Sequence, residues 1–148
     1  MPRKMDRSKV VIVLEDDQEI KELLASVLQD RGYYVVAVDS GRRALEVLQQ
    51  VRARLLVLDV MLPDMDGNEV LQAIREDARM QDTKVMILSG HVQLLSQGSI
   101  RRVSQLVPKP FDVEKIVYHV EELIGKAEIE AIPIKPLRLL PSRLAFAE

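Results

Sequence analysis

Five short runs of apolar residues alternate along the chain with longer segments of helical periodicity. The runs occupy residues 10–14, 34–38, 55–58, 84–88 and 105–107. They are rich in Val, Ile and Leu and do not alternate regularly with polar residues, a pattern typical of strands buried on both faces. The runs therefore predict five strands of a parallel sheet.

The segments between the runs carry apolar residues at every third or fourth position, as amphipathic helices do. The first segment ends at Gly32, and the second has Ser40 as its predicted N-cap. The third begins near Asn68, and the last runs from a cap at Asp112 to Gly125. These signals predict four well-defined helices.

The segment of residues 91–103 has a weaker pattern. Gly98 and several polar residues interrupt its apolar stripe, so we expect a short or mobile helix there. Strands and helices then alternate five times, which predicts an α/β fold with a doubly wound parallel sheet of five strands flanked by five helices.

Composition fits one cytoplasmic domain with a short appendage. Of the 148 residues 47% are apolar and 30% are charged, there is no cysteine, and the net charge is −2. No apolar stretch approaches the roughly 20 residues that cross a bilayer, so we expect no membrane partner. The charge gives no general attraction to nucleic acid, and no direct nucleic-acid binding is expected.

Three regions are distinguished by composition. Residues 1–8 form a basic N-terminal tail, residues 9–125 form the domain, and residues 126–148 form a C-terminal tail. The C-terminal tail contains Pro133, Pro136 and Pro141 but remains apolar, unlike a solvated linker. We expect it to pack on its own domain, on a partner or on a second copy.

Polar residues follow four of the five predicted strands. Glu15 and Asp16 follow the first strand, Asp59 the third, Ser89 the fourth, and Lys109 the fifth. In an open parallel sheet, sites form beyond the carboxyl ends of the strands, so these side chains are expected at one edge.

This set of groups suits phosphoryl transfer. Clustered carboxylates repel one another and favour a hard divalent cation such as Mg²⁺. A carboxylate in such a site can attack phosphorus, while a metal, a lysine and a hydroxyl neutralise the charge on the transferring group. The set is specific although no single member is.

The segments around these residues resemble the receiver domains of response regulators, the CheY-like family of two-component signalling. The resemblance covers residues 9–125 and depends on four motifs in the family's order: VVIVLEDDQEIKELL, LLVLDVMLPDMDG, ILSG and PKPF. It implies a flavodoxin-like fold whose five strands have the order 2-1-3-4-5.

The resemblance also assigns roles to the residues that match these motifs. Asp59 is the implied phosphoryl acceptor, and Mg²⁺ is the implied cofactor. The implied metal ligands are Glu15, Asp16, Asp59 and the backbone carbonyl of Met61. Ser89 is the implied switch hydroxyl, and Lys109, followed by a cis bond to Pro110, pairs with the phosphoryl group.

The family's mode of action follows from the same resemblance. The implied donor is a sensor histidine kinase or a phosphotransfer protein. The implied output is a surface of the fourth helix, fifth strand and fifth helix that binds a downstream partner or a second copy. Such a domain is a signalling module and not an enzyme, since it catalyses only its own phosphorylation and slow dephosphorylation.

One departure leaves an alternative open. Receiver domains usually carry Tyr or Phe three residues before the lysine, and here that residue is Leu106. A phosphorylation-independent interaction domain of the same fold is therefore the second hypothesis. A metal-dependent phosphohydrolase is weaker, because Met61 stands where such an enzyme needs an acid.

Simpler roles are expected for several other residues. Asp17 is expected to cap the first helix, because acids favour helix N-termini. His91 and His119 have no nearby residue that would complete a metal pair, and they are expected to be surface or packing residues.

Overall fold

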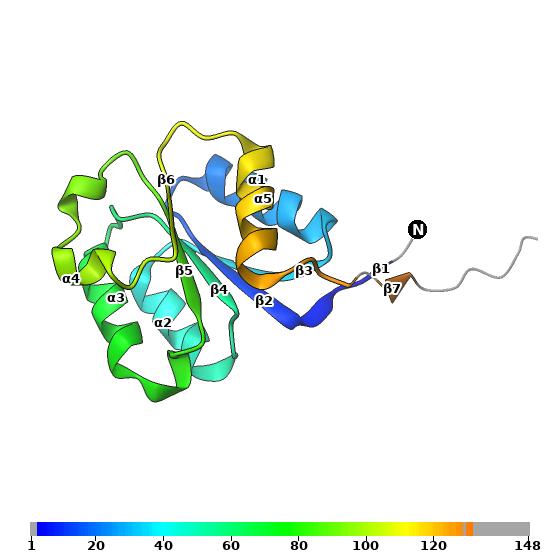
Figure 1. Ribbon diagram of the computed structural model, residues 1–148, viewed down its shortest axis with the longest axis horizontal. Coiled ribbons are helices and arrows are strands. Elements are labelled where there is room, and N and C mark those ends of the chain that lie inside the picture. Colours follow the sequence, from blue (N-terminus) through cyan, green and yellow to red (C-terminus); the bar gives the residue numbers. More distant parts are fainter. Residues whose placement is uncertain (1–2, 129, 132–148) are drawn as a thin grey trace, which may run out of the picture.

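The computed structural model of the protein describes residues 3–128 and 130–131, and within them the main feature is a five-stranded parallel sheet. Its strands have the order β3-β2-β4-β5-β6 (Figure 1). In chain order they are β2 (Asp6–Leu14), β3 (Tyr33–Val38), β4 (Leu55–Leu58), β5 (Lys84–Leu88) and β6 (Gln105–Val107). Since β2 is the first strand of this sheet, the predicted order 2-1-3-4-5 is confirmed.

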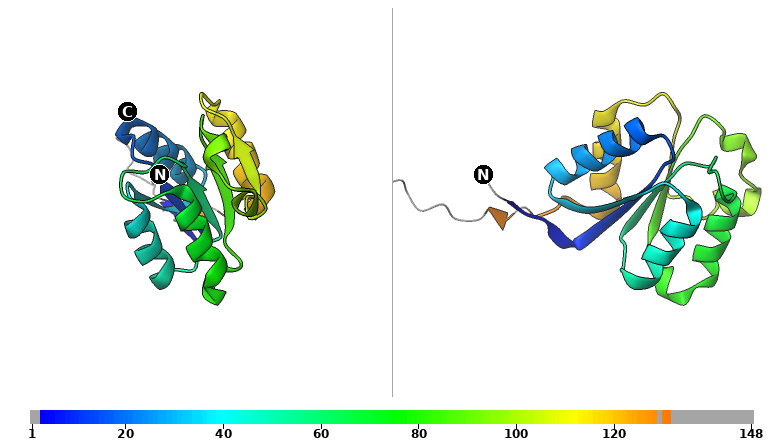
Figure 2. Two further views of the ribbon diagram at one scale, coloured as in Figure 1. Left: turned by 90° about the vertical axis from the view of Figure 1, so that its left-hand side faces the viewer. Right: turned by 180° about the vertical axis from the view of Figure 1, so that it is seen from behind.

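Five helices flank the sheet in two layers. They are α1 (Gln18–Asp30), α2 (Gly41–Gln50), α3 (Gly67–Glu76), α4 (Gln97–Ile100) and α5 (Val113–Ile124). Helices α1 and α5 cover one face, and α2 and α3 cover the other (Figures 1 and 2). Neighbouring residues of β2 divide between the layers, Ile12 packing with the α2–α3 side and Val13 with the α1–α5 side. This explains the absence of polar alternation in the strands.

The helix boundaries follow the capping residues in the sequence. The side chain of Asp17 accepts the N–H of Ile20, and those of Ser40 and Asp112 cap α2 and α5 in the same way. Asp66 and Glu69 form a capping box at the start of α3. Gly125 ends α5 with a φ of 82°, a conformation that favours glycine.

The segment between β5 and β6 is the least regular of the helical connections. This agrees with the interrupted apolar stripe of residues 91–103. It holds a 3-10 turn (Val92–Leu94) and then the four-residue helix α4. The N–H of Ser96 and the carbonyl of Leu94 are held by the side-chain amide of Asn68, each at 2.9 Å. This segment therefore depends on α3 for support.

The chain extends beyond the predicted boundaries at the start of the sheet. Strand β2 begins at Asp6 and not at Val10, and its pairing with β3 shifts register between these two residues. A two-residue strand precedes the domain and another follows it, β1 (Arg3–Lys4) and β7 (Glu130–Ala131), and the two strands pair antiparallel as a ribbon. The ribbon projects from the end of the sheet where β2 begins (Figures 1 and 2).

Polar contacts hold the chain after α5 at the same end. The Tyr33 hydroxyl donates to the carbonyl of Gly125 at 2.6 Å, and the carboxylate of Asp6 accepts the N–H of Glu128 at 3.0 Å. The expected packing of the tail on a partner falls mainly on residues 132–148, which lie outside the described residues. In the described ranges, each helix is too short or too polar to span a bilayer.

Adjacent leucines of α1 give a test of the core. Leu24 is 1% exposed and Leu23 is 45% exposed. We expect Leu24→Ala to lower the free energy of unfolding by about 2–5 kcal/mol, because it leaves a cavity between α1 and the sheet. Leu23→Ala should cost at most about 0.5 kcal/mol. Urea unfolding of the two variants measures the difference, and equal losses would contradict this packing.

Candidate functional site

Backbone hydrogen bonds between adjacent strand ends place the predicted site residues at one edge of the sheet. The N–H of Glu15 donates to Val38, that of Asp59 to Leu14, and that of Ser89 to Val107, each at 3.1 Å. Each residue thus extends the ladder by one position past its strand. The backbone of Glu15, Asp59 and Ser89 is therefore fixed by the sheet itself.

Three carboxylates gather at this edge. Glu15, Asp16 and Asp59 each offer an oxygen within 4.8 Å of the others. Glu15 and Asp59 are buried, at 2% and 7% exposure, whereas Asp16 is exposed. Clustered carboxylate oxygens with one side open to water match the preference of Mg²⁺, which takes hard oxygen ligands and keeps several waters. The residues therefore fit the predicted metal.

Lys109 reaches the same cluster from the segment that follows β6. Its Nζ lies 2.8 Å from Oε1 of Glu15 and 3.2 Å from Oδ2 of Asp59. The following peptide bond, to Pro110, is cis, as predicted. One ammonium group thus bridges two buried carboxylates.

The environment raises the pKa of both Glu15 and Lys109. Burial raises the pKa of Glu15, with a further contribution from the nearby charge of Asp59, and the hydrogen bond from Lys109 offsets this only in part. For Lys109, burial alone would lower the pKa, but the hydrogen bond to Glu15 and the charges of Asp59 and Glu15 raise it. Lys109 has two acidic partners and therefore keeps its proton. Within the described residues, Glu15 has only Lys109 as a basic partner and shares it with Asp59.

Ser89 lies at the end of β5, beside the strand that leads to Asp59. It is 1% exposed, and its Oγ accepts the N–H of His91 at 2.9 Å. Leu106, at the usual aromatic position, lies on the last strand of the sheet with 37% of its surface exposed. Ser89 thus follows the strand that pairs with the one leading to Asp59, and Leu106 is exposed.

Two of the simpler assignments agree with the structure. Asp17 caps α1, and its N–H donates to Oε2 of Glu15 at 3.2 Å. His119 lies 3.7 Å from Glu122 on the same helix, and His91 is exposed. Of these residues, Asp17 contacts the acid cluster, which consists of Glu15, Asp16 and Asp59.

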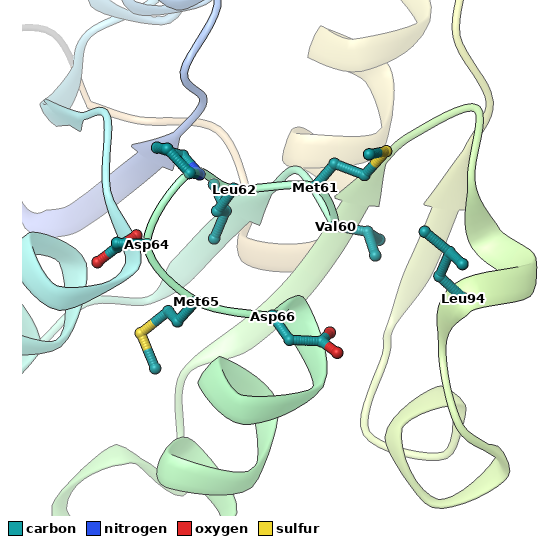
Figure 3. Close-up of a pocket in the computed structure, with 8 residues that line it drawn as sticks. Val60, Met61, Leu62, Asp64, Met65, Asp66 and Leu94 are labelled. Carbon is teal, nitrogen blue, oxygen red and sulfur yellow. The ribbon is translucent and has the colours of Figure 1, made fainter.

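The loop that follows Asp59 is closed on itself. The N–H of Met61 donates to Oδ1 of Asp59 at 3.1 Å, and Met61 pairs with Asp66 in a short antiparallel bridge. The N–H of Gly67 donates to the carbonyl of Val60 at 3.1 Å. A shallow hollow of about 440 Å³ opens between residues 60–66 and Leu94 (Figure 3).

Two residues that support the site were not found from the sequence. The Asp64 carboxylate accepts the backbone N–H groups of Gly41 and Arg42, at 2.8 and 2.9 Å, and Asn68 holds the segment after Ser89. Asp64 precedes the cap of α3 and resembles an ordinary turn residue, so the sequence carries no signal that it contacts another helix. The sequence places Asn68 at the start of a helix but gives no sign of its contacts with Leu94 and Ser96.

Comparisons with known proteins agree with this geometry. The family model of the response regulator receiver domain matches residues 11–121. The response regulator receiver protein CpdR of Brucella abortus is 30% identical over 118 residues, which are 78% of this chain and 97% of that protein. The DNA-binding dual master transcriptional regulator RpaA of Synechocystis is 31% identical over 143 residues. That match covers 90% of this chain but 59% of RpaA, so this chain spans little more than half of that relative.

Solved structures show the same fold. The response regulator protein TrrA of Thermotoga maritima, in complex with Mg²⁺-BeF, superposes with a TM-score of 0.69 at 29% identity. The superposition covers 78% of this chain and 98% of TrrA. With the family model matched over most of the domain and the acidic residues gathered at the carboxyl edge of the sheet, the chain belongs to the response regulator receiver domain family.

Proposed function

We propose that this receiver domain accepts a phosphoryl group on Asp59 in a magnesium-dependent reaction. The observation that carries the proposal is the arrangement of Lys109 between Glu15 and Asp59, with Asp16 completing an acid cluster within 4.8 Å. An acid cluster alone would suit many cations. The lysine adds a positive charge that can meet the oxygens of a phosphoryl group next to Asp59.

Every residue of the site has a role in this reaction, and Asp59 has two, as metal ligand and as acceptor. Glu15, Asp16, Asp59 and the backbone carbonyl of Met61 would hold Mg²⁺, and the complex of TrrA with Mg²⁺-BeF supports this choice of metal. When bound, the ion would neutralise negative charge as the phosphoryl group approaches the carboxylates. Lys109 would move its contacts from the two carboxylates to the phosphoryl oxygens. Ser89 would give up its hydrogen bond from His91 and donate a hydrogen bond from its hydroxyl to an oxygen of the phosphoryl group.

The phosphoryl donor is a phosphohistidine on a sensor histidine kinase or a phosphotransfer protein. An oxygen of Asp59 forms the new bond to phosphorus as the bond from phosphorus to the histidine nitrogen breaks. The nitrogen leaves with the electron pair, and Asp59 becomes an acyl phosphate. The added negative charge then shifts an existing equilibrium at α4, β6 and α5, the surface offered to a downstream partner or a second copy.

A phosphorylation-independent interaction domain is the second candidate, and Leu106 is the observation that favours it. A leucine on the outermost strand lacks the aromatic ring that would follow a movement of Ser89. Hydrogen exchange of the α4–β6–α5 surface separates the two functions. A change in exchange on phosphorylation supports the switch, and an unchanged pattern supports the second candidate.

Phosphorylation by a small donor tests the proposed acceptor. We expect wild-type protein with acetyl phosphate and Mg²⁺ to gain the mass of one phosphoryl group, and Asp59→Asn to gain none, because an amide is not a competent nucleophile. Intact-protein mass spectrometry measures the gain, and omission of Mg²⁺ should abolish it. Asp17→Asn is the matched control, since it changes an acid that caps α1 and should leave the gain intact. Equal gain in the Asp59→Asn variant would contradict the assignment.

Acidification tests the role of Glu15 in metal binding. Burial raises the pKa of Glu15 above its ordinary value of 4.5, and a proton competes with Mg²⁺ for the carboxylate. The affinity for Mg²⁺ should therefore fall on acidification, and the fall should begin at a higher pH than for a glutamate with an ordinary pKa. Calorimetric titration at several pH values measures this loss. In Glu15→Gln the affinity for Mg²⁺ should be lower at pH about 7 and should depend less on pH. An unchanged pH profile in this variant would exclude Glu15 as the group whose protonation weakens Mg²⁺ binding.

A further inference from the structure

The carboxylate of Asp64 connects the loop after Asp59 to the start of α2. Its Oδ1 accepts the N–H of Gly41 at 2.8 Å, and its Oδ2 accepts that of Arg42 at 2.9 Å. Gly41 and Arg42 are the first two residues of α2, where backbone N–H groups have no partner within the helix. Figure 3 shows the side chain of Asp64 directed away from the hollow, toward the cyan ribbon that leads into α2.

The start of α2 has a particular need for this negative charge. Its first turn reads Gly41-Arg42-Arg43, which places two cations at the positive end of the helix dipole. Its own cap, Ser40, accepts the N–H of Arg43 at 3.2 Å with a neutral hydroxyl. The N–H of Arg42, followed by that of Gly41, lowers the pKa of Asp64, so the carboxylate remains charged at neutral pH. Asp64 therefore supplies from another element the anion that the sequence of α2 omits.

Packing reinforces the same connection. Met65 lies so close to Gly41 that a Cβ at this position would overlap its side chain. On the other side of the loop, the N–H of Met61 donates to Asp59 at 3.1 Å. The backbone of residues 59–67 is thus held at Asp59, at α2 through Asp64 and Met65, and at α3 through its capping box.

We propose that Asp64 is a positioning residue for the magnesium site, which fastens the loop that carries the Met61 carbonyl to the amino terminus of α2. The proposal rests on the proposed function, since it takes Met61 as a backbone ligand of Mg²⁺. Loss of the Asp64 contacts lets the loop move and weakens the metal site without removing any ligand. Because coupling between sites is reciprocal, Mg²⁺ in turn stabilises the start of α2.

Hydrogen exchange without metal tests the fastening directly. We compare wild type with Asp64→Asn, whose amide loses the charge and turns an NH₂ group toward one of the two backbone N–H groups. Exchange in residues 59–67 should be faster in this variant. Ser40→Ala is the matched control, because it removes a cap from the same end of α2 but leaves the Asp64 contacts. It should speed exchange in α2 and leave residues 59–67 as in wild type.

Metal affinity gives the second readout. Calorimetric titration with Mg²⁺ should show a dissociation constant about tenfold higher for Asp64→Asn, as for other residues that support metal ligands, and a wild-type value for Ser40→Ala. Circular dichroism identifies the temperature range in which all variants are folded. Wild-type exchange of residues 59–67 in the Asp64→Asn variant would overturn the proposal. An equal loss of Mg²⁺ affinity in Asp64→Asn and Ser40→Ala would also overturn it, because Asp64 would then contribute only to the stability of α2.

A measurement on the wild-type protein alone guards against poor folding of the variant. Saturation with Mg²⁺ should slow exchange at the amides of Gly41 and Arg42, and unchanged exchange there would also overturn the proposed coupling. If wild-type protein fails to bind Mg²⁺, the proposed function fails. The exchange comparison in the metal-free protein then still decides whether Asp64 fastens the loop.

Discussion

Two carboxylates are buried at the ends of adjacent apolar strands, and the arrangement of the site follows from the need to neutralise them. Glu15 and Asp59 are fixed by backbone hydrogen bonds that continue the sheet, so neither can move away from the other. An unpaired buried charge is strongly unfavourable, and Lys109 supplies a cation between them. With Asp16, the three carboxylates and one ammonium leave two negative charges, which one divalent cation would balance. Burial raises the pKa of Glu15, and the negative charge of Asp59 adds to this effect.

Much of the fold could be predicted because its signals are local. The strands at residues 55–58, 84–88 and 105–107 have the predicted bounds. The first is buried throughout and the second from Val85 onward, whereas β6, at the edge of the sheet, leaves Leu106 exposed. Ser40, Asp112 and Gly125 mark helix ends because capping needs only neighbouring residues. The extension of β2 to Asp6 was not predicted, because these polar residues join the strand through contacts of Asp6 with Gly32 and Glu128, which are far from it in the sequence. The conformation after Ser89 likewise depends on Asn68, from another helix.

The site, like the fold, has parts that the sequence predicts and parts that it does not. Parallel strands carry their following residues to one edge, so the gathering of Glu15, Asp16, Asp59 and Lys109 follows from the order of the motifs. The support of that edge does not follow from it. Asp64 contacts a helix that precedes it in the chain, and a turn residue in the sequence gives no sign of such a distant partner. Residues that support a site through contacts between different elements are therefore less evident in a sequence than the residues that follow its strands.

The ribbon of β1 and β7 has a consequence for protein engineering. Arg3 and Ala131 are register partners, so the two ends of the described chain lie side by side at the edge of the sheet opposite the carboxylates. A short turn can join these residues, which makes the domain suited to circular permutation, with new termini opened in a surface connection such as that before β5. A fluorescent reporter inserted between β1 and β7 would sit away from the acid cluster and leave access to Asp59 open.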